Sequence, residues 1–459
     1  GLSDGTAPTS PIGALVAGVG TLAFGTQGLV ILMTLLLLAG PLGKSAQFPF
    51  HEWLPEAMAG PGPVSALIHA ATMVKSGVYL VARLVPLFYY ARWVVGAEEA
   101  GWFFHLAAWI GAFTAFLAAT QGMVALELKK ILAYSTVSQI GYMMLGLGIA
   151  GLAPALLVSG LTAGIFHLVS HALFKACLFL CAGTIIHAVH SIYIQDMGAL
   201  RRFLPLTFVF TLLAALSLMG LPPLPGFWSK DAILLATFEA SRPLFVLALL
   251  TVGITAFYTV RFLGIVFYGS KSENLEHVEQ EGGRLVDGAL SMRFAVGTFA
   301  AMIVVAGLGG PLIERALHES FEASVPGVFE GFALTTETGQ GSSAHSLVPF
   351  LSLCLIAVGA LPAYYLYFAR KASPQALIEK YAAIQTLYTF FGRRWFIEGF
   401  YRRVFVQGTL RLSSFVAENV EDTMDRLVHR NLPVLFTKKT LSAVNRLRTE
   451  TEELLYNVS

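Results

Sequence analysis

Three titratable residues lie four positions apart in one of the most apolar stretches of the chain. The stretch "LTAGIFHLVSHALFKACLFLCAGTIIHAV" contains His167, His171 and Lys175. Four residues are slightly more than one helical turn, so on a helix the three side chains form one stripe. Histidine titrates near neutral pH, and burial brings lysine within reach of neutrality. The spacing therefore predicts a stripe that passes protons.

A metal site and a structural role are the two alternatives for this stripe. Histidines at positions i and i+4 have a spacing that zinc accepts. No glutamate follows His167 as in the H-E-x-x-H motif, and no third ligand is evident, so the sequence does not predict zinc. A structural role would require three separate hydrogen-bond partners in the same apolar surroundings. We therefore expect proton chemistry here.

Further ionisable residues lie within other apolar stretches. A charge at membrane depth costs at least ~2.5–3.5 kcal/mol, so such side chains usually face a bundle interior or a hydrated cavity. Lysines and histidines that alternate at this depth predict a hydrated proton relay. Besides the stripe, these residues are Lys44, His69, Lys75, Lys230 and Asp231.

Most of them also have a simpler interpretation. Lys44 and Lys230 lie beside predicted helix breaks, where an ammonium group can satisfy free carbonyls. Lys75, like Arg83, can extend its charge to the membrane interface. His69 alone would fit a hydrogen-bonded histidine of the core.

Asp231 has two interpretations, which are compatible. It either pairs with Lys230 or stands near the N-terminus of the helix that follows "PGFWS". In both cases Asp231 would modulate the pKa of the neighbouring lysine. His187 and His190, at the end of their helix, are expected at the membrane interface.

The composition indicates which elements must position these residues. Hydrophobic residues make up 56% of the 459 and charged residues only 13%, whereas soluble domains reach roughly 25% charged. The apolar runs are continuous rather than alternating, so we predict an all-α polytopic membrane protein. The net charge of +2 does not suggest nucleic acid as a partner. The predicted spans are Leu29–Gly43, Val64–Leu87, Phe103–Ala119, Ile131–Ala150, Ala155–Ala188, Phe203–Gly220, Leu244–Phe267, Ala295–Gly309 and Leu347–Phe368.

The charges divide the chain into two parts. From Lys371 onward 22 of 89 residues are charged, against 36 of the preceding 370. This contrast predicts a transmembrane domain at residues 1–370 and an amphipathic segment at residues 371–459.

Two of the predicted spans are interrupted in a related way. They are "LLLLAGPLGKSAQFPFHEWLPEAMAGPGP", with Lys44, and "LLAALSLMGLPPLPGFWSKDAILLAT", with Lys230. Proline removes a backbone donor, and paired interrupted helices indicate an inverted-repeat transporter and its ion path. A third span, Ala155–Ala188, is longer than a bilayer requires, and Gly164 and Gly183 allow it to bend or break.

The cysteines give no indication of a redox centre. Cys177, Cys181 and Cys354 all lie in apolar stretches, and without a further pair they predict buried thiols rather than a metal site. The chain shows no iron–sulfur cysteine cluster, no Rossmann glycine pattern and no haem motif. We expect neither cofactor nor metal in this chain.

Four long motifs resemble a known family. They are "GKSAQFPFHEWLPEAMAGPGPVSALIHAATMVKSGVYLVARL", "ELKKILAYSTVSQIGYMMLGLG", "FHLVSHALFKACLFLCAG" and "GFWSKDAIL". Together they resemble the antiporter-like membrane subunits of respiratory complex I, and most closely the L-type, or chain 5, subunit. The resemblance covers Leu29 to Phe267.

This resemblance implies a proton-translocating subunit with two inverted repeats, each with a broken helix. It implies that flavin, iron–sulfur clusters and quinone belong to partner subunits, and it leaves the electron donor open. The implied surroundings are other membrane-arm subunits and the lipid bilayer of an energy-transducing membrane, here a prokaryotic plasma membrane. The residues that match the family's relay are Lys44, His69, His167, His171, Lys175, Lys230 and Asp231.

The tail extends the resemblance. The stretch "FFGRRWFIEGFYRRVFVQGTLRL" resembles the approach to the long lateral helix of the L-type subunit. About 60 helical residues would reach roughly 90 Å, with an interruption expected at Pro433. A surface helix that binds lipid alone is the alternative. The family's first helices, its first-repeat glutamate and its last span are expected to lie outside this chain, which by itself should not pump.

Two other functions stay open at this point. A lysine at position 75 is a feature in which the chain resembles the large subunit of multisubunit Na⁺/H⁺ antiporters. That assignment would make the chain part of a transporter rather than of a redox enzyme. A homologue for inorganic-carbon uptake, with a soluble zinc partner, would use the same helices.

Overall fold

The described part of this computed structural model is helical and covers residues 11–280, 285–324 and 344–456. Within it, the only β-type pairing is an isolated bridge between Glu127 and Tyr193. The predicted all-α fold is therefore confirmed. The chain divides into two compact units, one that ends at Phe391 and one that begins at Gly392. The predicted boundary at residue 370 stays a prediction.

The first unit contains sixteen α-helices within the described ranges. They are α1 (Pro11–Lys44), α2 (Trp53–Glu56), α3 (Gly62–Ala70), α4 (Met73–Tyr89), α5 (Gly101–Val124), α6 (Leu128–Ile149), α7 (Leu157–Val189), α8 (Pro205–Met219), α9 (Pro225–Ala240), α10 (Arg242–Phe267), α11 (Glu273–Gln280), α12 (Leu290–Leu308), α13 (Gly310–Ser324), α14 (Ala344–Ala363), α15 (Pro374–Lys380) and α16 (Ala382–Gly392).

Seven helical stretches of the described residues are long and apolar enough to cross a membrane. Two of the predicted spans fall outside this set for different reasons. The span Ile131–Ala150 forms α6, which includes Lys129 and a run of polar residues, and the span Phe203–Gly220 forms α8, which has only 15 residues. The seven stretches are Gln27–Lys44, Gly62–Val94, Glu98–Val124, Pro154–Val189, Arg242–Phe267, Leu290–Leu308 and Ala344–Phe368.

Both predicted helix breaks are present. Helix α1 contains Pro41 and ends at Lys44, and the next short helix, α2, begins only at Trp53. Helix α8 ends at Met219, and the proline-rich segment before α9 separates the two halves of the second broken helix. Proline has no backbone N–H and cannot continue the helical ladder, which explains why both spans are interrupted there.

A third break lies directly after His69 and has no proline. Helices α3 and α4 are separated at Ala71 and Thr72 within what the sequence predicts as one span. The Thr72 hydroxyl and its backbone N–H both donate to the carbonyl of Leu67, five residues earlier. This widened turn interrupts the ordinary ladder, as π-type turns do at many functional sites.

Helix α7 is unbroken, contrary to the break that Gly164 and Gly183 allow. It runs through 33 residues from Leu157 to Val189. A Cβ on Gly62 of α3 would lie 3.1 Å from the Cα of Gly183. Gly183 therefore serves a close approach of α3 to α7 rather than a bend.

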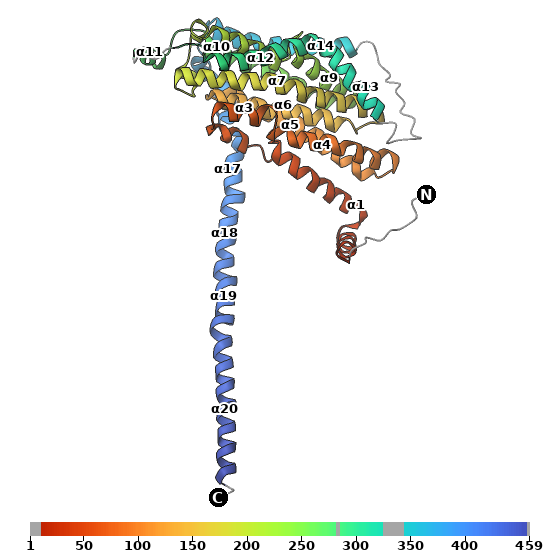
Figure 1. The fold of residues 1–459 in the computed structure, drawn as a ribbon, viewed down its shortest axis with the longest axis vertical. Coiled ribbons are helices and arrows are strands. Elements are labelled where there is room, and N and C mark those ends of the chain that lie inside the picture. Colours follow the sequence, from red (N-terminus) through yellow and green to blue (C-terminus); the bar gives the residue numbers. More distant parts are fainter. Residues whose placement is uncertain (1–10, 281–284, 325–343, 457–459) are drawn as a thin grey trace. The chain divides into compact units, whose positions relative to one another are not determined.

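Helix α7 is the central element of the first unit (Figure 1). It packs against α3 and α6 on one side and against α8, α9, α12 and α13 on the other. Behind α6, α5 packs so closely that a Cβ on Gly111 would lie 2.6 Å from the carbonyl oxygen of Gly141. These contacts enclose the stripe on α7 between α3, α6 and the second broken helix, formed by α8 and α9.

The second unit is a succession of helical segments with exposed apolar side chains. Pro433 stands at the second position of its last helix, after a π-helical turn, so the helix type changes where the sequence predicts an interruption. Its segments are η8 (Arg394–Phe396), α17 (Ile397–Tyr401), η9 (Arg402–Val406), α18 (Gln407–Val416), η10 (Ala417–Glu421), α19 (Asp422–Asp425), η11 (Arg426–Asn431) and α20 (Leu432–Tyr456).

Candidate proton relay

The stripe on α7 is completely buried. His167, His171 and Lys175 each expose 0% of their surface. The two imidazole rings have their centroids 6.4 Å apart, as residues one helical turn apart should. The structure therefore places the three predicted residues in one file inside the first unit.

His167 is held by two other helices. Its Nδ1 lies 2.9 Å from the hydroxyl of Ser229 on α9, and its Nε2 lies 3.1 Å from the side-chain oxygen of Gln139 on α6. The Ser229 hydroxyl also lies 3.0 Å from the Pro225 carbonyl, to which it can donate. Because both ring nitrogens have a partner, the ring orientation is fixed.

His171 is the opposite case. Both of its ring nitrogens are buried, and neither makes a hydrogen bond within the part of the chain that the structure describes. Its ring packs on Phe174 with centroids 5.2 Å apart. A buried polar group without a partner costs about 1–3 kcal/mol. A role in packing does not explain why a histidine stands here.

Within the described ranges, the Lys175 ammonium group is bound by polar groups of α6 only. Its Nζ donates to the Leu132 carbonyl at 3.0 Å and to the hydroxyl of Ser135. Ser135 also donates to the Leu132 carbonyl at 2.8 Å. Among the described residues, neither this lysine nor Lys230 forms an ion pair with a carboxylate.

His69 faces the same file from α3. Its ring stacks on Phe179 of α7, one turn beyond Lys175, with centroids 4.3 Å apart and an interplanar angle of 21°. It is fully buried, and its two ring nitrogens make no hydrogen bond in the described chain. The interpretation as a hydrogen-bonded core histidine is therefore wrong.

Lys75 is buried beside the stripe and does not extend to an interface. It exposes only 5% of its surface, and its Nζ donates to the carbonyl of Leu168 at 2.7 Å. Leu168 follows His167 directly, so the ammonium group lies along α7. Arg83, in contrast, is exposed on α4. The structure thus places Lys75, which is not among the residues that match the family's relay, beside the stripe.

Lys230 lies on α9, and its side chain reaches back across the break to α8. It is 2% exposed, and its Nζ donates to the carbonyl of Leu218 at 2.8 Å, near the end of α8. The same nitrogen lies 5.6 Å from the ring centroid of Tyr142, and that ring lies 6.3 Å from the ring of His167. Lys230 is therefore connected to the stripe through Tyr142 and through its neighbour Ser229.

Asp231 does not join this file. It forms no ion pair with Lys230, and it is the seventh residue of α9 rather than part of its N-terminus, so both predicted interpretations fail. Consecutive helical residues point about 100° apart. Its carboxylate is instead close enough to Glu314 of α13 for the two to interact electrostatically.

Lys44 also stands apart from the file. It is the last residue of α1, and its side chain is exposed within this chain. The segment that follows is buried, with the Ser45 hydroxyl donating to the Val74 carbonyl at 2.8 Å. The structure therefore joins the segment after Lys44, but not the Lys44 side chain, to the helix that carries Lys75.

Four polar residues of the site are missing from the predicted set. Gln139, Ser135 and Tyr142 lie on α6, and Ser229 lies on α9; all four are fully buried. The available signal is the run of hydroxyl and amide side chains inside the apolar span Ile131–Ala150. Each contacts a residue at least 28 positions away, so spacing alone could not assign partners.

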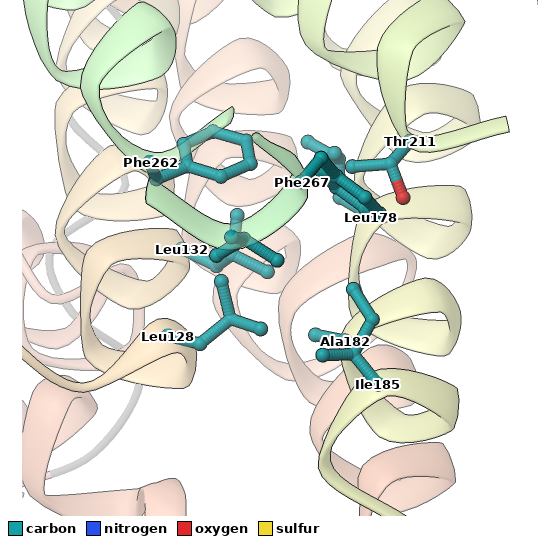
Figure 2. A pocket seen from close by; sticks show the side chains of 9 residues that line it. Leu128, Leu132, Leu178, Ala182, Ile185, Thr211, Phe262 and Phe267 are labelled. Carbon is teal, nitrogen blue, oxygen red and sulfur yellow. The ribbon is translucent and has the colours of Figure 1, made fainter. Parts of the chain in front are cut away.

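One flank of the file is dry. Figure 2 shows a pocket between α6, α7, α8 and α10, lined by eight apolar side chains and Thr211. Its volume is about 10 Å³, and the Thr211 hydroxyl already donates to the Thr207 carbonyl. A water molecule needs more than one polar partner at this size. The apolar wall insulates the stripe on this side.

The titratable groups of the file lie so close together that protonation of two neighbours at once is unfavourable. Two positive charges at the 6.4 Å separation of the His167 and His171 rings repel by roughly 3 kcal/mol at an effective dielectric constant of about 20. A proton on one group therefore makes a second proton on its neighbour unfavourable. Such a row of bases can accept protons one at a time and hand them on.

Comparison with known proteins decides the family. Residues 14–255, more than half of the chain, match the family described as NADH:quinone oxidoreductase/Mrp antiporter, transmembrane. The chain belongs to this family. Every relay candidate lies within the matched residues.

Two relatives of this chain are chain 5, or L-type, subunits. The chain is 36% identical over 421 residues to the NAD(P)H-quinone oxidoreductase chain 5 of a Picosynechococcus species, covering 85% of this chain and 58% of the relative. It is 34% identical over 450 residues to the chain 5 of a Synechocystis species, covering 89% and 62%. The chain thus spans about three fifths of these relatives. The resemblance to the L-type subunit is confirmed.

A solved structure extends the likeness to the tail. The Mrp complex from Dietzia sp. DQ12-45-1b contains a chain with 27% identity and a TM-score of 0.59. The match covers 97% of this chain and 47% of that one. The antiporter-like fold of this multi-pass membrane protein is therefore shared with both branches of the family.

Proposed function

We propose that the chain is the proton-translocating part of an L-type membrane subunit in a complex I-like NAD(P)H:quinone oxidoreductase. It passes protons along a buried file of His69, Lys75, Lys175, His171, His167 and Lys230. The observation that carries this proposal is the pair of histidines, His69 and His171, whose four ring nitrogens are buried and have no partner in the part of the chain that the structure describes. A proton relay needs such free acceptors, whereas a packed core avoids them.

Each member of the file has a distinct part. Lys230 of α9 forms one end of the file, and its partner is a backbone carbonyl of α8 that remains available after the lysine gives up a proton. His167 connects to Lys230 through Ser229 and Tyr142. Histidine accepts a proton at one ring nitrogen and releases another from the second, so it can pass protons onward. Lys175 and His69 continue the file to the α3 side.

Lys44 and Asp231 belong to the proposal in a different way. They lie at the two broken helices, outside the file that this chain forms, and we assign them to its two approaches. The neighbouring membrane-arm subunits are the proposed partners, and flavin, iron–sulfur clusters and quinone are assigned to other subunits. The proposed location is the plasma membrane of a prokaryote.

Replacement of Lys230 by alanine and by glutamine in the full-length subunit tests this function. Alanine should reduce the ratio of protons moved per electron, because the file loses its end group. Glutamine can still donate to the Leu218 carbonyl but cannot carry a proton at neutral pH. The glutamine variant should therefore assemble into the complex but not recover proton transport. Proton transport is measured as acidification of vesicles during quinone reduction.

The glutamine variant separates the two interpretations of this lysine. If it pumps like the wild type, the ammonium group only satisfies the carbonyl of the broken helix, and the proposal is refuted. Unimpaired pumping by the alanine variant would also refute the proposal.

A second function is favoured by two observations. Buried Lys75 and the match along 97% of the chain to a protein of an Mrp complex fit the large subunit of a Na⁺/H⁺ antiporter. Purification of the intact complex discriminates between the two. Co-purified flavin and iron–sulfur subunits support the oxidoreductase, whereas sodium-driven proton exchange without them supports the antiporter.

A further inference from the structure

A second line of buried polar groups leaves the file at Lys175. The Ser135 hydroxyl, which accepts a hydrogen bond from Lys175, lies beside the hydroxyl of Tyr258 on α10. Tyr258 is fully buried, and its hydroxyl lies near the hydroxyls of both Thr255 and Ser135 without a hydrogen bond of normal geometry in the described chain. Thr259, the next residue, has a buried hydroxyl that has no partner among the same residues.

The line continues along the contact between α10 and the end of α5. A Cβ on Gly122 would lie 3.5 Å from the Tyr258 ring, so this part of α5 faces the tyrosine. Gln121 lies one helical turn before Ala125, whose carbonyl accepts a hydrogen bond from Arg261 of α10, so Gln121 is on the same face of α5. Both polar atoms of its side chain are buried and have no partner among the described residues. Such groups are unusual, because buried polar groups are normally satisfied by protein or by ordered water.

Arg261 stands one helical turn beyond Tyr258. It exposes 6% of its surface and donates to the carbonyl of Ala125 at 2.9 Å. Within the described residues it forms no ion pair. It lines a cavity of about 1000 Å³ between the end of α5, α10, α15 and α16. Besides the Ala125 carbonyl, its polar neighbours include the hydroxyl of Tyr367, which lines the same cavity.

We propose that Tyr258 and Gln121 form a hydrated branch that connects Lys175 with the cavity at Arg261, so that the relay exchanges protons with the surface there as well as along α7. This inference rests on the proposed function. The flank on the other side of Leu132 and Phe262 is the dry pocket of Figure 2, which limits the branch to the α5 side of α10.

The proposed step balances with water as the only co-reactant. A hydronium ion in the branch gives a proton to the Tyr258 oxygen, while the phenol passes its own proton to the Ser135 oxygen. Ser135 turns its hydroxyl from the Leu132 carbonyl and gives its own proton to the neutral amine of Lys175. One O–H bond forms and one breaks at each hydroxyl, hydronium becomes water, and the amine becomes an ammonium group.

Replacement of Tyr258 by phenylalanine in the intact complex tests the branch, with Tyr89→Phe as the matched control. Both tyrosines are fully buried, but Tyr89 donates to the Pro154 carbonyl at 3.0 Å, away from the file. Proton translocation should fall roughly tenfold in Tyr258→Phe, less than for a group of the file itself because the path along α7 remains, with unchanged thermal stability. Tyr89→Phe should lower thermal stability and leave translocation unchanged.

Cysteine accessibility provides a second readout that does not depend on pumping. Tyr258→Cys should react with a membrane-impermeant, anionic methanethiosulfonate, which Arg261 attracts. Phe262→Cys, one turn away on the same helix in the dry pocket, should not. The native cysteines Cys177 and Cys181 are buried, and the unsubstituted complex gives the background reaction.

The outcomes separate the branch from the proposed function. Wild-type pumping by Tyr258→Phe together with an unreactive Tyr258→Cys would overturn the branch, even if Lys230→Ala stops pumping. A loss of stability in Tyr258→Phe equal to that in Tyr89→Phe would also overturn it, because the hydroxyl would then be a structural partner. If Lys230→Ala pumps normally while Tyr258→Cys reacts, the branch stands and only the proposed function fails.

Discussion

Replacement of Lys175 by methionine is expected to lower proton translocation by roughly 100-fold, the usual range for loss of a proton-transferring group. Methionine has a similar length and fills the same space, so packing should be retained. The Leu132 carbonyl keeps its hydrogen bond from Ser135, so no backbone acceptor is left unpaired. The measurement is the initial rate of proton uptake in vesicles that contain the intact complex, normalised to its electron-transfer rate.

Lys371→Met is the matched control for this substitution. Lys371 is exposed and lies outside the file, so its replacement should change neither assembly nor translocation. If Lys175→Met assembles and still translocates protons at the wild-type rate, protons do not pass through this position.

Replacement of His171 by phenylalanine is expected to stop translocation without destabilising the protein. Phenylalanine keeps an aromatic ring beside Phe174, and no hydrogen bond within the described chain is lost with the two ring nitrogens. The temperature of thermal unfolding of the purified complex should therefore stay equal or rise. Proton uptake by the same preparation should be lost.

This opposition between stability and activity distinguishes a relay from a core. His167→Phe serves as the contrast, because His167 has two hydrogen-bond partners and its loss should lower stability as well as translocation. If His171→Phe lowers the unfolding temperature and leaves translocation intact, His171 is a structural residue.

Sequence alone could predict much of the fold because membrane helices depend on local properties. Continuous apolar runs and proline positions depend on neighbouring residues only, and they place the spans and the breaks at Lys44 and Lys230. The break after His69 was not predictable in this way, because it depends on Thr72 bonding to Leu67 within an otherwise regular span. Gly183 was misread as a possible bend because its contact, Gly62, lies on another helix.

In the site, too, features within one helix were predictable from sequence and contacts between helices were not. The stripe on α7 is a property of one helix and is visible as a four-residue spacing. The contacts of His167 with Gln139 and Ser229 join residues 28 and 62 positions apart, and no single-sequence pattern contains them. Lys75 could equally extend to an interface until the packing of α4 against α7 was known. Asp231 was assigned by adjacency to Lys230, although neighbouring helical residues face different directions.

The most direct measurement is a map of ordered water in the intact, full-length complex at a resolution that shows individual molecules. The proposed relay predicts one connected series of waters and side chains that joins His69, Lys175, His171, His167 and Lys230. Waters should contact the free ring nitrogens of His69 and His171. If those nitrogens instead lie against apolar side chains, with no water between the titratable groups, protons cannot pass along this file.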